Sequence, residues 1–224
     1  MKWRLAAMLG CGLLVVSLFA RADERRHELC ARLPKGHTCT IVVEEPWSTP
    51  PKDSVHTEDG KLTLKFENGE KRTWTNNIVD GEPMDTYTLE GFLAKSRHFL
   101  IWHSEYEEAN GELVSYANGD SVVIYDHPEV YPDGKRFFTI VDPYGGDGSS
   151  SLNIYSLAKA RVSQVAAFDI SQWKVLAKGI WVTSSEIAIF GLPVDSSEET
   201  GSAEFLGTAR LVNGKWKLVR VGHR

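Results

Sequence analysis

The stretch VYPDGKRFFTIVDPYGGDGSSSLNIYSLAKARVSQVAAF, from Val130 to Phe168, shows a regular succession of short apolar segments and turn sequences. Segments rich in Val, Ile, Phe and Tyr, bounded by Pro, Gly and Asp, are typical of β-strands joined by turns. The predicted strands are Val130–Tyr131, Lys135–Val141, Ser151–Ser156 and Val162–Ala167. The predicted connections are Pro132–Gly134, Asp142–Ser150 and Leu157–Arg161. The stretch therefore predicts one four-stranded antiparallel unit.

The same order of strands and turns recurs on both sides of this unit. The preceding stretch GFLAKSRHFLIWHSEYEEANGELVSYANGDSVVIY fits it with a first turn at Lys95–Ser96, so that Phe99 corresponds to Phe137. The following stretch WKVLAKGIWVTSSEIAIFGL fits the first three strands with a turn near Lys178–Gly179. A period of about 40 residues built from four short strands is typical of β-propeller blades. The last strand of the opening unit also has helical propensity, but the strand interpretation places it in the repeat.

Asn-Gly and Asp-Gly pairs divide the strands, at ENGE, ANGD, PDGK and VNGK. Such pairs supply the positive φ angles of tight hairpin turns. They predict two further hairpins at the ends of the chain, Lys61–Asn76 and Thr208–Val221. We therefore predict an all-β fold, a small β-propeller of four or five blades of four-stranded antiparallel sheet. A terminal strand, CTIVVEE or KWKLVRV, is expected to close the ring.

One blade carries a family resemblance. HPEVYPDGKRFFTIV followed by SLNIYSLAKARVSQVAAF resembles a blade of the WD40-like bacterial propellers, the group that includes the TolB C-terminal domain. Those repeats carry a Ser-Pro-Asp-Gly-Lys turn, whereas Tyr131 stands here in place of the serine, and Ala158–Ala160 replaces a glycine-bearing turn. The resemblance implies the fold over residues 88–192. It implies no catalytic residues, because the repeat motif is structural.

The first residues have the layout of a secretory signal. Lys2 and Arg4 precede an apolar run, Leu5–Ala20, and Ala20-Arg21-Ala22 has the small residues of a signal peptidase site. We predict a signal peptide at residues 1–22, with an uncleaved anchor or a lipoprotein signal ending at Cys11 as alternatives. A disulfide-stapled segment at 23–56 and a propeller-like domain at 57–224 then follow. The mature chain is expected to be periplasmic or secreted and to have no membrane span.

The net charge indicates which class of partner the mature chain can bind. Removing residues 1–22 turns 25 basic and 30 acidic side chains into 22 and 30, a net charge of −8. Such a chain repels phosphate backbones and favours a cationic partner, unless the carboxylates serve only solubility.

In an oxidising compartment the remaining pair, Cys30 and Cys39, is expected to form a disulfide. A redox or metal pair is the alternative, with His37 as the only other good ligand nearby.

No cofactor and no metal are predicted. DPYGGDGSSS has the glycine and aspartate content of calcium loops but neither their repeat nor their spacing. His98 and His103 lie five residues apart, which on one strand places them on opposite faces, so they cannot chelate one ion together.

Loops of successive blades are expected to open on one face. These loops supply an acidic, tyrosine-bearing surface suited to binding a partner. Its predicted partner-binding residues are Glu105, Tyr106, Glu107, Asp126, His127, Asp142, Tyr144, Asp147 and Asp169. We predict an exported, non-catalytic binding module. A glycan-binding or glycoside-hydrolysing propeller that pairs Asp142 with Glu105 or Asp169, and a purely structural envelope component, are the alternatives.

Overall fold

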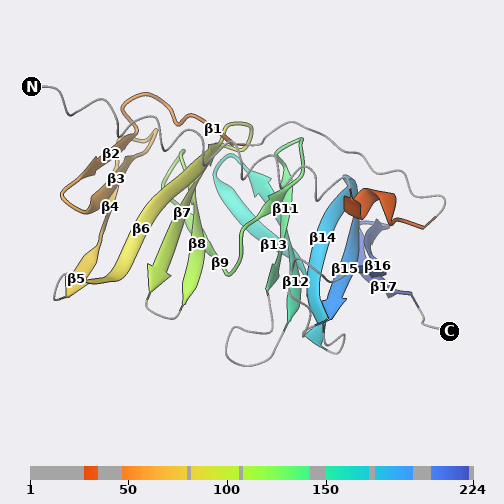
Figure 1. Cartoon of the computed structure of the whole chain (residues 1–224). Helices are drawn as coiled ribbons and strands as arrows, with labels where there is room; N and C mark the ends of the chain where they lie inside the picture. Colours follow the sequence, from red (N-terminus) through yellow and green to blue (C-terminus); the bar gives the residue numbers. More distant parts are fainter. Residues whose placement is uncertain are drawn as a thin grey trace, which may run out of the picture.

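The computed structural model describes residues 28–34, 47–79, 82–105, 108–141, 150–171, 175–193 and 203–221. These residues form an all-β protein with one short helix, at residues 28–31, which confirms the predicted class. The strands are arranged in four small antiparallel sheets that stand side by side in a row (Figure 1). The predicted signal peptide at residues 1–22 lies outside the described residues.

Apart from β1 (Trp47–Ser48), which pairs with β6 (Glu82–Leu93) across the sequence of the first sheet, each sheet is built from strands that follow one another in the sequence. The first sheet contains β2 (Val55–Glu58), β3 (Lys61–Lys65) and β4 (Lys71–Thr75). The second contains β1 (Trp47–Ser48), β5 (Asn77–Val79), β6 (Glu82–Leu93), β7 (His98–Glu105), β8 (Ala109–Ser115) and β9 (Ser121–Ile124). The third contains β10 (Glu129–Val130), β11 (Arg136–Val141), β12 (Ser151–Ala158) and β13 (Arg161–Asp169). The fourth contains β14 (Val175–Thr183), β15 (Glu186–Pro193), β16 (Glu204–Val212) and β17 (Lys215–Arg220).

The third sheet confirms the four-stranded unit predicted for Val130–Phe168. Its strands pair in the order β10-β11-β12-β13, with Phe137 opposite Tyr155 and Leu152 opposite Phe168. The segment with helical propensity is a strand, as predicted. The glycines of the four quoted turns, Gly69, Gly119, Gly134 and Gly214, all have positive φ.

The predicted turn at Lys178–Gly179 is wrong. Both residues lie inside β14, and the chain reverses at residues 184–185 instead. A β-carbon at Gly179 would lie 2.7 Å from a ring carbon of Phe138, which belongs to the third sheet. The glycine therefore allows two sheets to approach each other closely and does not form a turn.

Three apolar layers hold the four sheets together. Neighbouring residues of one strand point to opposite faces, so Phe137 packs with Leu100 toward the second sheet, while Phe138 packs with Trp181 toward the fourth. The layer between the first and second sheets contains Leu64 and Phe99 together with Trp74. Burial on both faces explains why the inner strands are almost continuously apolar.

The two ends of the row are finished differently. The outer face of the first sheet is polar, and the Thr63 and Thr73 hydroxyl oxygens lie 2.9 Å apart across it in a hydrogen bond. The outer face of the fourth sheet is apolar and is covered by the segment 28–34, where Leu29 and Leu33 pack on Phe190. Ends of this kind allow a stack of repeats to stop without closing on itself.

The described residues do not form the expected closed ring. The first and fourth sheets lie at opposite ends of the row (Figure 1). The segment KWKLVRV, expected as a closing strand, is β17 and pairs with β16 of its own sheet. The other expected closing segment, CTIVVEE, lies outside the described residues. The described residues contain no helix that is long and apolar enough to cross a membrane.

Candidate functional site

One edge of the second and third sheets gathers acidic side chains, and we call it the acidic edge. Strand pairing defines it: Asp85 lies opposite Glu105, and Val141, Ser151 and Asp169 lie side by side at the end of the third sheet. The described residues that carry its charge are Glu82, Asp85, Glu105, Glu108, Asp126, Glu129 and Asp169. No lysine or arginine occurs in the described stretches that form it, 77–79, 82–86, 103–105, 108–110, 124–129, 150–151 and 167–171.

The opposite edge of the second and third sheets is rich in cations. It is formed by the turns 94–97, 116–120, 131–136 and 158–161. The basic residues in these turns are Lys95, Arg97, Lys135, Arg136, Lys159 and Arg161, and the acidic ones are Asp120 and Asp133. In an antiparallel meander, successive connections lie at opposite edges of the sheet. The basic residues lie in the connections at one edge and most acidic residues in those at the other, so the two kinds of charge are separated.

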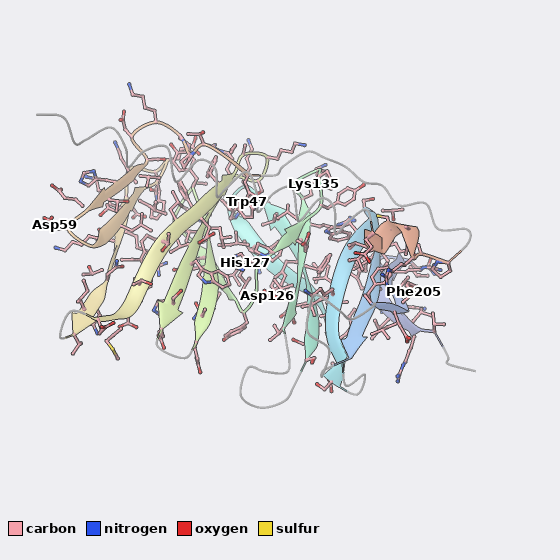
Figure 2. The ribbon with its side chains drawn as sticks, in the orientation of Figure 1. Trp47, Asp59, Asp126, His127, Lys135 and Phe205 are labelled. Atoms are coloured by element: carbon pink, nitrogen blue, oxygen red, sulfur yellow. The ribbon has the colours of Figure 1, made fainter. Side chains whose placement is uncertain are left out.

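The predicted binding residues fall along the acidic edge wherever the structure describes them. Glu105 ends β7, Asp169 ends β13, and Asp126 with His127 lies in the connection from β9 to β10, between the second and third sheets (Figure 2). The other five predicted residues lie outside the described residues: Tyr106, Glu107, Asp142, Tyr144 and Asp147. Glu105 and Asp169 belong to different sheets of the row, so they spread along an edge and do not surround a common mouth.

Four side chains meet on one face at the corner of the second sheet where β6 begins and β7 ends. Asp85 and Tyr87 of β6 lie opposite Glu105 and His103 of β7. His103 Nε2 lies 3.5 Å from Asp85 Oδ1 and 3.5 Å from Glu105 Oε1. The Asn77 side-chain amide donates a hydrogen bond to Asp85 Oδ2 at 3.2 Å. We call Asp85, His103 and Glu105 the corner cluster.

Tyr87 forms the wall of the corner cluster. Its ring stacks on the His103 imidazole with 4.3 Å between centroids and 2° between planes. Its backbone N–H donates to Asn76 Oδ1 at 2.9 Å, which fixes the strand at this point. Burial raises the pKa of Tyr87, and the nearby carboxylates of Asp85 and Glu105 raise it further. The phenol therefore stays neutral at neutral pH, and the stacking holds the imidazole in one plane.

A second pair of rings lies in the connection between the second and third sheets. His127 stacks on Trp102 with 3.9 Å between centroids, and its backbone N–H donates to Asp126 Oδ1 at 2.7 Å. Trp102 is only half-buried, whereas Trp74 and Trp181 are buried in the layers between sheets.

Asp169 closes the end of the third sheet. Its Oδ1 accepts a hydrogen bond from the Ser171 backbone N–H at 2.9 Å, and hydrogen bonds from Ser171 lower the pKa of Asp169. The Ser171 hydroxyl oxygen in turn accepts from the Ser150 backbone N–H at 2.7 Å. Asp169 is thus ionised at neutral pH and fixes Ser171, which in turn holds Ser150, the last residue of the predicted loop Asp142–Ser150.

Glu105 was predicted for the binding surface, but its pairing with Asp85 and His103 was not predicted. The rule that His98 and His103 cannot share one ion holds, since His98 is fully buried and His103 faces the corner. The side chain that completes the cluster beside His103 and Glu105 is Asp85, which lies on the neighbouring strand β6. Alternation along β6 and β7 gives the faces, but only the register shows which residues lie opposite each other.

The structure describes only one of the two cysteines of the predicted disulfide. Cys30 lies in the segment 28–34 that covers the fourth sheet, and Cys39 lies outside the described residues, so the pairing stays a prediction.

No protein-family model matches the chain. No curated protein matches it significantly either.

Proposed function

We propose that the protein is an exported, non-catalytic binding module whose acidic edge engages a cationic protein partner. One observation supports this: in the described part of the second and third sheets, acidic residues occupy one edge, and lysines and arginines collect at the other. A one-sided field of this kind orients an approaching partner and speeds its association. We further propose that each four-stranded sheet is a blade of the WD40-like type, here set in a row.

The acidic edge suits a protein surface better than a small molecule. Asp85 and Glu105 meet at one point, but the carboxylates as a group are spread along the edge, because they come from the ends of β7 and β13 and from the β9–β10 connection. His127 offers an exposed ring beside Asp126, stacked on Trp102. Aromatic rings flanked by charges are common anchors of protein interfaces.

We expect a salt-sensitive interaction with basic proteins. The protein is immobilised and exposed to periplasmic extract or culture fluid, and the captured proteins are identified and remeasured singly by surface plasmon resonance. Affinity should fall steeply as ionic strength rises, because the screening length shrinks to about 8 Å at 0.15 M. The variant Glu82→Lys with Glu108→Lys reverses two exposed charges of the acidic edge and should bind roughly tenfold more weakly or worse.

The matched control places the same reversals elsewhere. Glu70→Lys with Glu90→Lys alters net charge equally at exposed positions outside the acidic edge, and it should bind nearly as well as the unmodified protein. Equal loss in both variants would show that only net charge matters. Binding that ignores salt and survives Glu82→Lys with Glu108→Lys would exclude the acidic edge as the interface.

A further inference from the structure

The corner cluster brings a mixed set of ligand atoms to one point. One imidazole nitrogen and two carboxylate oxygens, from Asp85, His103 and Glu105, all lie within 4.8 Å of one another. His103 Nε2 is buried, and neither carboxylate reaches it within the usual length of a hydrogen bond. The carboxylates face each other across a strand pair, where like charges are unfavourable unless a cation lies between them.

The two distances from His103 Nε2 to the carboxylates fit a shared metal ion. Zinc binds imidazole nitrogen and carboxylate oxygen at about 2.0–2.2 Å, so two ligands of one tetrahedral ion lie about 3.3–3.6 Å apart. The two contacts of His103 Nε2 measure 3.5 Å each. A nitrogen ligand also argues against calcium and magnesium, which prefer oxygen alone.

The surroundings have the features of a supported site. Asn77 holds Asp85 Oδ2 and leaves Oδ1 turned toward His103, and the stacked Tyr87 ring fixes the imidazole plane. Such outer contacts orient metal ligands in many proteins. The His103 side chain is 13% exposed and that of Glu105 is 49% exposed, which gives an ion a path from solvent. Three protein ligands leave a fourth position for water or for a group of a partner.

We propose that Asp85, His103 and Glu105 bind one divalent transition-metal cation, with zinc as the best-matched ion. This inference goes beyond the proposed function and does not depend on it, because none of the three residues is altered in the charge-reversal test above. An ion in this site would neutralise the two carboxylates at one point of the acidic edge and could accept a ligand group at its open position.

Titration of the metal-free protein tests the site. The untagged protein is treated with chelator and titrated with Zn²⁺ by calorimetry at pH 7, and with Co²⁺ while its visible spectrum is recorded. We expect one tight site per chain and the absorption of a low-symmetry, four-coordinate Co²⁺. Asp85→Asn, which keeps the shape of the side chain, should weaken Zn²⁺ binding by about 10–100-fold or more, and His103→Ala should abolish the Co²⁺ signature.

Two controls keep the result interpretable. His127→Ala removes another histidine of the same edge and should leave the titration unchanged, which separates the corner cluster from general surface binding. Ca²⁺ should bind far more weakly than Zn²⁺. Absence of a one-to-one site, unchanged Zn²⁺ binding in Asp85→Asn, or Ca²⁺ binding as tight as Zn²⁺ would each overturn the proposal, and the cluster would then be a histidine packed between two carboxylates without an ion.

Discussion

Replacing Phe138 by alanine is expected to lower the free energy of unfolding by about 3–5 kcal/mol. Phe138 is 1% exposed and lies in the layer between the third and fourth sheets, with its ring centroid 5.4 Å from that of Trp181. The backbone of Gly179 closes over the ring, so the surrounding strands cannot collapse into the space that the ring leaves. Urea unfolding followed by tryptophan fluorescence measures the change.

The matched control is Val165→Ala in the same sheet. Val165 lies on β13 and is 47% exposed, so its truncation should cost well under 1 kcal/mol. A loss below about 1 kcal/mol for Phe138→Ala would mean that the third and fourth sheets do not pack through this layer.

Acid is expected to destabilise the fold through His98 by up to about 3 kcal/mol. His98 is fully buried at the start of β7, and this burial lowers the pKa of its imidazole from 6.5 to about 4, with the Ser96 backbone offsetting part of the effect. Between pH 4 and 6.5 the unfolded chain therefore binds more protons at this residue than the folded one. The stability that comes from keeping His98 neutral and buried is fully present above about pH 6.5 and is lost as the pH falls toward 4.

Denaturant unfolding at a series of pH values measures this dependence. In His98→Leu the slope between pH 4 and 6.5 should become much shallower, whatever the variant's stability at pH 7. His127→Gln, at an exposed histidine of the acidic edge, should keep the original slope. An unchanged slope in His98→Leu would assign the acid sensitivity to other groups.

Local patterns predicted the strands and most of their connections. The sequence from Val130 to Phe168 contains strong turn residues between apolar runs, so its four strands follow from short-range rules alone. The same rules failed at Lys178–Gly179, because a glycine that serves close packing against Phe138 looks like a turn glycine until the neighbouring sheet is known.

Long-range arrangement was less predictable. Four sheets in a row and four blades in a ring need the same strands and the same two-sided burial, so the sequence does not distinguish them locally. The outer faces of the two end sheets distinguish a row from a ring. The outer face of the first sheet is polar and carries Thr63 and Thr73, and the apolar outer face of the fourth sheet is covered by Leu29. The corner cluster was hidden for a similar reason, since Asp85 and His103 meet only through the register of β6 and β7.

The distance between the two outer sheets tests the central claim, an open row of four sheets, most directly. Nitroxide labels are attached through a non-natural keto amino acid at Thr73 of the first sheet and Lys217 of the fourth, both exposed. Their separation is measured by double electron–electron resonance, with dipolar broadening of the continuous-wave spectrum for short separations. Packed sheets are spaced by about 10 Å, so the row predicts a distance of about 30 Å or more. A narrow distribution near about 10–15 Å, the spacing of adjacent blades in a closed ring, would contradict the row.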